Sequence, residues 1–123
     1  MIYSETSPTM DIEAEYERGF QLRCEGDYAG AMQAFERVLS SDPNHLKAAM
    51  QIGLIKGYQG DFDGSLATLS ALASKYPNHL DLRYELAMTQ MMLGMIDEGC
   101  ANFKFILSVD PTHERALQQS AYC

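Results

Sequence analysis

The chain has few cysteines and no long apolar run, the features that form disulfides, metal sites and membrane-spanning helices in small proteins. It has no tryptophan, three cysteines and no run of about 18 apolar residues, the length that a membrane-spanning helix needs. The cysteines, Cys24, Cys100 and Cys123, are odd in number and lack Cys-x-x-Cys spacing. This argues against a disulfide framework and against a structural zinc site. We therefore expect reduced thiols and no transmembrane helix.

Basic residues are also scarce. Nine Lys and Arg stand against 17 Asp and Glu, which gives a formal net charge of −8. Nucleic acid binding requires a basic surface, so we expect no nucleic acid partner. The first ten residues, MIYSETSPTM, contain Glu5 and no basic cluster before an apolar stretch, unlike a secretory signal. We predict a cytoplasmic protein in which residues 1–10 are a flexible lead.

Against this background the chain contains a strict repeat. Three glycines and three prolines each recur at intervals of 34 residues, at Gly26, Gly60 and Gly94 and at Pro43, Pro77 and Pro111. The 16 residues between each glycine and its proline, and between that proline and the next glycine, are enough for a helix of about four turns. The pattern predicts first helices at 11–25, 45–59 and 79–93, and second helices at 28–41, 62–75 and 96–109.

Other positions keep the same period. The eighth and twentieth residues of each repeat are small, and the twenty-fourth is large and apolar, namely Gly19, Gly53 and Ala87, then Ala31, Ser65 and Gly99, then Phe35, Leu69 and Phe103. Small residues let two helices approach at their crossing, and the bulky residue fills the space beside it. Asn44, Asn78 and Thr112 are the expected N-caps of the helices that follow them.

These residues resemble the tetratricopeptide repeat, a 34-residue helix-turn-helix unit. The resemblance rests on Gly26-Asp27-Tyr28, Gly60-Asp61-Phe62 and the three prolines, and it covers residues 12–123. It implies an all-α, right-handed superhelical stack of helix-turn-helix repeats, a solenoid. Repeats one, two and three occupy 12–45, 46–79 and 80–113, and 114–123 form a partial fourth unit or capping helix.

The first repeat has a polar outer face. Arg18, Gln21 and Glu25 occupy places that are more apolar in the later repeats. Terminal repeats carry such a face because nothing stacks on them. We therefore expect no further repeat before it.

The concave face of this family is lined by the first helix of each pair. In this chain the corresponding residues are nearly all apolar or aromatic, and they define the candidate groove: Tyr16, Phe20, Met50, Leu54, Tyr58, Tyr84, Met88, Met91 and Met92. Each of them, taken singly, could instead complete the core, as helical stripes usually do. Four of the eight methionines fall in this set, and methionine can repack around different apolar partners.

The charges beside this groove are mainly acidic. Asp81 and Glu85 stand at positions where some tetratricopeptide domains carry the basic residues of a clamp for acidic chaperone tails. Tyr16 and Phe20 replace the Lys and Asn of that clamp. An acidic peptide would therefore meet like charge, and we expect an amphipathic helix with basic flanks to dock here, unless this face is merely solvated.

Nothing in the sequence indicates catalysis. The chain has no P-loop, Gly-x-Ser-x-Gly, His-Glu-x-x-His or dinucleotide motif. His45, His79 and His113 recur with the repeat, but equivalent places on successive hairpins are about 16 to 20 Å apart. A metal ion cannot bridge them, and we interpret them as helix-start residues. The sequence predicts no catalytic residue, metal or cofactor.

The resulting hypothesis is a non-enzymatic protein-protein interaction module of adaptor or chaperone-like type. Its groove would capture a helical or extended apolar segment of another protein. In size and architecture it is similar to the helical-repeat chaperones of bacterial secretion systems. The alternative is a structural repeat protein that associates with itself, with a homodimer as the expected form.

Overall fold

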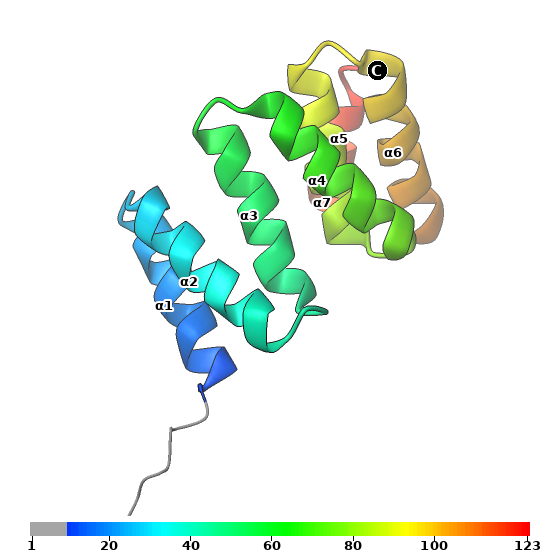
Figure 1. Cartoon of the computed structure of the whole chain (residues 1–123). Coiled ribbons are helices and arrows are strands. Elements are labelled where there is room, and N and C mark those ends of the chain that lie inside the picture. Colours follow the sequence, from blue (N-terminus) through cyan, green and yellow to red (C-terminus); the bar gives the residue numbers. More distant parts are fainter. Residues whose placement is uncertain (1–9) are drawn as a thin grey trace, which may run out of the picture. The chain divides into compact units, whose positions relative to one another are not determined.

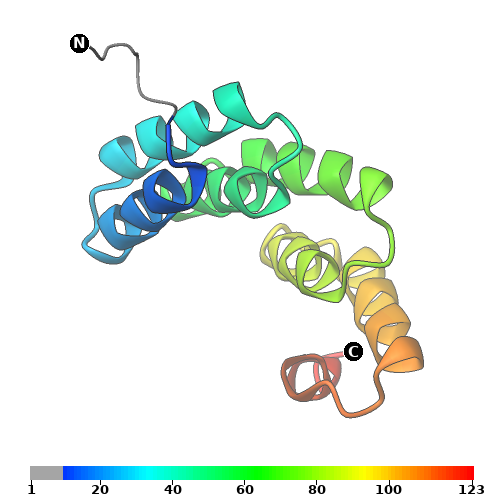
Figure 2. The same cartoon turned by 90° about the horizontal axis from the view of Figure 1, so that it is seen from below.

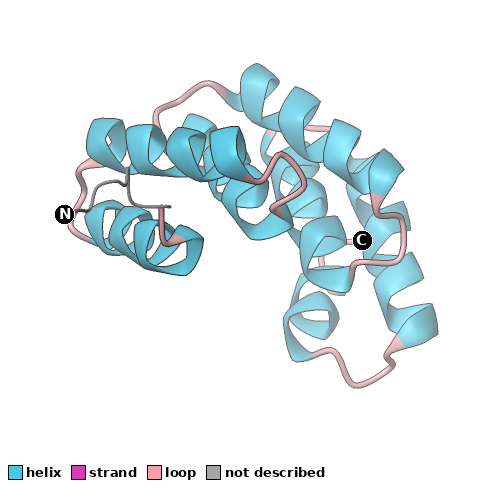
Figure 3. Ribbon diagram, turned by 60° about the horizontal axis from the view of Figure 1, so that its bottom comes forward, coloured by secondary structure: helices cyan, strands magenta, loops and turns pink. Residues whose placement is uncertain are grey.

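The structure, a computed structural model, describes residues 10–123, which form α-helices and no strand (Figure 3). The expected lead at 1–10 lies outside the described residues apart from Met10. The helices are α1 (Ile12–Cys24), α2 (Tyr28–Ser41), α3 (Leu46–Tyr58), α4 (Phe62–Lys75), α5 (Leu80–Met92), α6 (Ile96–Val109) and α7 (Glu114–Ser120). The predicted bounds of α2, α4 and α6 are confirmed, while α1, α3 and α5 are one residue shorter at each end.

The chain divides into two compact units, one ending at Gln51 and one spanning Ile52–Cys123, which we refer to as the N-terminal and C-terminal units. In the N-terminal unit α1 and α2 pack side by side (Figure 1). In the C-terminal unit α4 packs on α5, α5 on α6 and α6 on α7. Helices α5, α6 and α7 are the yellow, orange and red helices of Figure 2. No helix among residues 10–123 combines the length and apolar character needed to cross a membrane.

The repeated glycines reverse the chain inside each helix pair, as expected. Gly26, Gly60 and Gly94 have φ of 85°, 89° and 78°, a conformation that side chains with a Cβ rarely adopt. At the first turn the amide of Gly26 donates to the Arg23 carbonyl (3.0 Å), and the amide of Asp27 donates to the Leu22 carbonyl (2.9 Å). This pair of bonds is the Schellman arrangement, which satisfies the free carbonyls at the end of α1.

Histidine, rather than the preceding residue, caps the first helix of later repeats. The Nδ1 atoms of His79 and His113 accept hydrogen bonds from the amides of Leu82 and Ala116, both at 3.1 Å. His45 Nδ1 accepts from the Ala48 amide at 3.1 Å in the same way. The N-caps predicted at Asn44, Asn78 and Thr112 are therefore wrong by one residue. Imidazole Nδ1 stands at the same covalent distance from the backbone as the Asn side-chain oxygen, so it can replace that acceptor.

The small residues lie at the helix crossings, as the pattern predicted. A Cβ atom added to Gly19 would stand 2.8 Å from Phe35 Cε1, and one added to Gly53 would stand 2.9 Å from Leu69 Cδ2. At Gly99 the same atom would meet the Met91 sulfur at 2.7 Å. Real Cβ atoms do not come this close to other atoms, so these glycines allow the close approach of the two helices in a pair.

Polar contacts also join the helices of a pair. Glu15 on α1 accepts a hydrogen bond at 2.8 Å from Arg37 on α2. On α5 the Arg83 guanidinium lies 3.9 Å from the centre of the Phe105 ring and donates to Asn102 at 3.0 Å. Asn102 in turn donates to buried Gln90 at 2.7 Å, so these two buried amides are paired.

The expectation of three reduced thiols is wrong. Cys100 on α6 and Cys123, which follows α7, form a disulfide with their Cα atoms 5.8 Å apart and a sequence separation of 23. Three cysteines can form one disulfide within the chain. α7 turns back along α6, so Cys123 meets the start of that helix. Cys24 is free and exposed.

Candidate functional site

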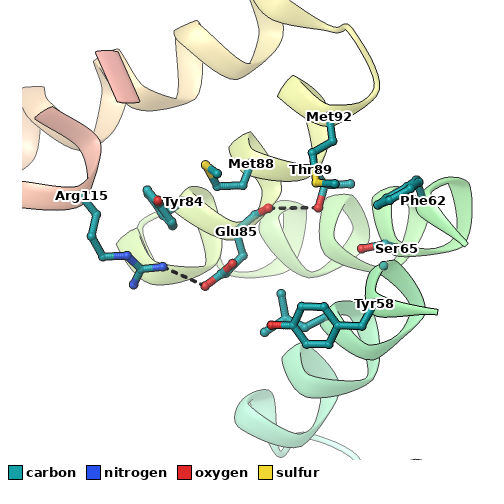
Figure 4. Close-up of a pocket in the computed structure, with 11 residues that line it drawn as sticks. Tyr58, Phe62, Ser65, Tyr84, Glu85, Met88, Thr89, Met92 and Arg115 are labelled. Carbon is teal, nitrogen blue, oxygen red and sulfur yellow. Dashed lines mark hydrogen bonds and ion pairs between the residues drawn. The ribbon is translucent and has the colours of Figure 1, made fainter. Parts of the chain in front are cut away.

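A pocket of about 300 Å³ opens in the C-terminal unit (Figure 4). It is built by the end of α3, the start of α4, one face of α5 and the first turn of α7. The lining residues are Leu54, Gly57, Tyr58, Phe62, Ser65, Tyr84, Glu85, Met88, Thr89, Met92 and Arg115. Small-molecule sites are mostly apolar and have volumes of about 300 to 1,000 Å³, so this pocket is at the low end of that range.

Apolar side chains dominate one end of the pocket. Met88 and Met92 lie one helical turn apart on α5, so they share a face. Tyr58 is 52% exposed and Met92 is 64% exposed, which leaves much of their surface to water. Covering that surface would release free energy, about 1 to 2 kcal/mol for each side chain, because part of each is already buried.

An ion pair stands at the other end. The Arg115 guanidinium lies 4.0 Å from the centre of the Tyr84 ring and 3.2 Å from the Glu85 carboxylate. Partial burial lowers the pKa of Arg115, but bonds to Tyr84 and Glu85 together raise that pKa above its ordinary value. The guanidinium is therefore charged. Its side chain is the more exposed partner, 53% against 24% for Glu85.

The other polar groups of the pocket are already engaged or hidden. The Thr89 hydroxyl donates to the Glu85 carbonyl at 3.2 Å (Figure 4), and Ser65 is buried. No group of three or more His, Cys, Asp or Glu among residues 10–123 is placed to hold a metal ion. The arrangement can bind an apolar side chain beside a charged pair, and it positions no nucleophile against a base.

The structure brings part of the candidate groove together. Leu54, Tyr58, Tyr84, Met88 and Met92 line the pocket. Tyr84 is 7% exposed and also belongs to the core cluster of Ala87, Phe103, Ile106 and Ala116. Met91 lies on the other side of α5, against Gly99 and this cluster.

The remaining groove residues, Tyr16, Phe20 and Met50, belong to the N-terminal unit. Tyr16 is 8% exposed, and its ring lies 5.5 Å from the ring of Phe35 and 5.3 Å from that of His45. Burial raises the pKa of the Tyr16 phenol above its ordinary value. This residue contributes to the packing of its own unit, and Met50 and Phe20 stay half-buried.

Sequence reasoning missed five lining residues, Gly57, Phe62, Ser65, Thr89 and Arg115. Arg115 had a signal, because it holds the second place of the partial fourth unit, equivalent to Asp81 in the third. Phe62 had none, since it begins a second helix and the groove was assigned to first helices alone. The pocket reaches Phe62 because α4 packs directly on α5.

Solved structures with this fold are tetratricopeptide proteins. A MamA structure from Desulfovibrio magneticus RS-1 is 24% identical with a TM-score of 0.77, over 91% of this chain and 63% of that one. The first such domain of Spaghetti (RPAP3), bound to the HSP90 peptide SRMEEVD, is 12% identical with a TM-score of 0.81, over 90% and 88%. The second domain of human RPAP3, in complex with the HSP70 peptide SGPTIEEVD, is 14% identical with a TM-score of 0.77, over 90% and 92%.

These likenesses show the fold alone. This chain spans less than two thirds of the length of the MamA structure. No curated protein sequence matches it significantly. A profile of the tetratricopeptide repeat family matches residues 13–45 and 47–79, which is more than half of the chain and in phase with the repeats expected from the glycines and prolines. The chain therefore belongs to the tetratricopeptide repeat family.

Proposed function

We propose that this protein is an interaction module, of adaptor or chaperone-like type, whose pocket captures an apolar segment of a partner protein. The exposed apolar surface of Tyr58 and Met92 beside half-buried Met88 carries this proposal. Tetratricopeptide repeats are in general non-enzymatic interaction units, and the RPAP3 structures hold peptides of partner proteins.

The peptides in those structures are acidic, and we do not expect this chain to prefer acidic peptides. Asp81 is exposed, and Glu85 is paired with the cation of the pocket, Arg115. A formal net charge of −8 favours a partner segment that is apolar with basic flanks. The ordering cost of such a segment makes micromolar affinity the expected range.

Replacing both Tyr58 and Met92 by serine is expected to weaken binding at least tenfold, because each change removes apolar surface that a ligand would bury. Peptides would first be selected on the wild-type protein from a displayed random library. Their affinity for the variant would then be measured by fluorescence polarisation. Tyr84 is left unchanged because it is part of the core.

The matched control replaces Tyr122 and Ile96 by serine. These residues are 73% and 43% exposed and do not line the pocket. The control variant should keep full affinity, and both variants should keep the helical circular dichroism of the wild type. Selected peptides that bind the pocket variant as tightly as the wild type would contradict the proposal.

A second candidate function is self-association. Leu117 on α7 is 48% exposed and Tyr122 is 73% exposed, and exposed apolar surface at a chain end favours association. We expect the apparent mass of the Cys24→Ser protein, which removes the free thiol, to rise from monomer to dimer by light scattering over a hundredfold concentration range without reductant. A monomer throughout would exclude self-association and leave the partner-binding hypothesis.

A cytoplasmic location remains our proposal. In the cytoplasm the Cys100–Cys123 disulfide would be expected to form transiently or to sense redox conditions, because stable disulfides are rare there.

A further inference from the structure

The last helix of the chain depends on few contacts. α7 has seven residues, and helices of this length do not persist alone in water. Ala116 is its one fully buried residue, packed with Tyr84, Ala87, Phe103 and Ile106. Leu117 beside it is 48% exposed. α7 therefore stays folded through its ties to the rest of the C-terminal unit.

Those ties also shape the pocket. His113, the N-cap of α7, stacks on the Tyr84 ring with 6.1 Å between ring centres, and Arg115 covers the same ring at 4.0 Å. Arg115 also pairs with Glu85. Tyr84, Glu85 and Arg115 all line the pocket. If α7 leaves, Tyr84 becomes exposed and the pocket keeps the Glu85 carboxylate without its cation.

A covalent bond joins the end of α7 to α6. Cys123 is exposed and Cys100 is half-buried, so an external thiol can reach the bond. The disulfide closes a loop that contains most of α6 and all of α7. Such a closure restricts the unfolded forms of the loop and so favours the docked helix.

We propose that Cys100–Cys123 is a redox-sensitive clasp that holds α7 in place and thereby maintains the Arg115 wall of the pocket. A dithiol reductant opens it: one thiolate attacks the exposed Cys123 sulfur and displaces the Cys100 thiolate, and the second thiol resolves the mixed disulfide. Two electrons and two protons pass to the protein, and the reductant becomes a disulfide. The proposal rests on the pocket geometry and not on the identity of any ligand.

The first test is amide hydrogen exchange, read by mass spectrometry, of a Cys24→Ser protein in its oxidised form and after reduction by dithiothreitol. The amides of Ala116 and Leu117, which donate to His113, should exchange about tenfold faster or more once the clasp is open. Amides of α2 in the N-terminal unit should not change. Reoxidation should restore the slow exchange.

The second test follows the pocket wall by nitration of tyrosines with tetranitromethane. It compares the oxidised Cys24→Ser protein with a variant in which all three cysteines are serine. Tyr84, 7% exposed, should be nitrated faster in the thiol-free variant. Tyr28 on α2 is half-buried in the N-terminal unit and serves as the internal reference that should react equally in both proteins.

Three results would overturn the proposal. α7 could exchange equally in the oxidised and reduced proteins. Opening the bond could accelerate exchange throughout α2 as well, which would mean global destabilisation in place of local release. Cys100 and Cys123 could stay as thiols after equilibration with oxidised glutathione. None of these measurements requires a partner, so failure of the proposed function leaves them unaffected.

Discussion

Gly53→Leu is expected to lower the melting temperature of the protein by roughly 5 to 15 °C, because overpacking a helix crossing costs about 1 to 3 kcal/mol. A Cβ atom at this place would lie 2.9 Å from Leu69 Cδ2 and 3.2 Å from Thr68 Cγ2. The rest of the leucine side chain has no space beyond them. Ala87→Phe should act in the same direction, since Ala87 is fully buried in the core cluster. Thermal melting followed by circular dichroism measures both.

Gly57→Ala is the matched control on the same helix, one turn further along α3. An added Cβ atom there would lie 3.4 Å from the Ser65 Oγ atom, an ordinary contact. Alanine also restricts the unfolded chain, so this change should be neutral or stabilising by up to about 1 kcal/mol. Equal melting temperatures for Gly53→Leu and the wild type would show that the assumed helix crossing is wrong.

Phe103→Ala should have a still larger effect and destabilise the C-terminal unit by about 3 to 5 kcal/mol. The Phe103 ring has no exposed surface and lies 5.9 Å, centre to centre, from the Tyr84 ring. Removing it leaves a cavity between α5, α6 and α7 that neighbouring side chains can only partly fill. Urea denaturation measures the loss, which would be a large part of the stability of a domain this size.

Phe105→Ala is the matched control for this change. Phe105 is on the same helix but only partly buried, and its ring contacts the Arg83 guanidinium. We expect a loss below half of that for Phe103→Ala. Similar losses for the two variants would mean that Phe103 does not occupy the centre of the core.

The repeat by itself predicts where the helices lie. Glycine between helices needs positive φ, and proline follows the end of the second helix, so their common period predicts both ends of α1 to α6 to within one residue. The expected capping helix at 114–123 is shorter, because α7 ends at Ser120. The small residues at the crossings followed from the same register. Gly19, Gly53 and Gly99 lie where a Cβ atom would collide with the partner helix.

The candidate site was predictable only in part, because a helical stripe does not indicate what covers it. Tyr58 and Met92 lie open in the pocket, while Met91, adjacent in sequence to Met92, packs against Gly99. One residue along a helix is a rotation of about 100°, enough to pass from solvent to core. Arg115 enters the pocket because α7 folds back over Tyr84.

The spacing of glycine, proline and small residues was sufficient to establish the family and the helix pairs, since backbone geometry and helix packing act locally and repeat with the sequence. The disulfide and the ion pair between Arg115 and Glu85 required the folded chain. Cys100 and Cys123 are 23 residues apart in sequence and become neighbours only when α7 returns along α6. Contacts of this kind depend on where helices meet in space, and a pattern that is the same in every repeat does not encode them.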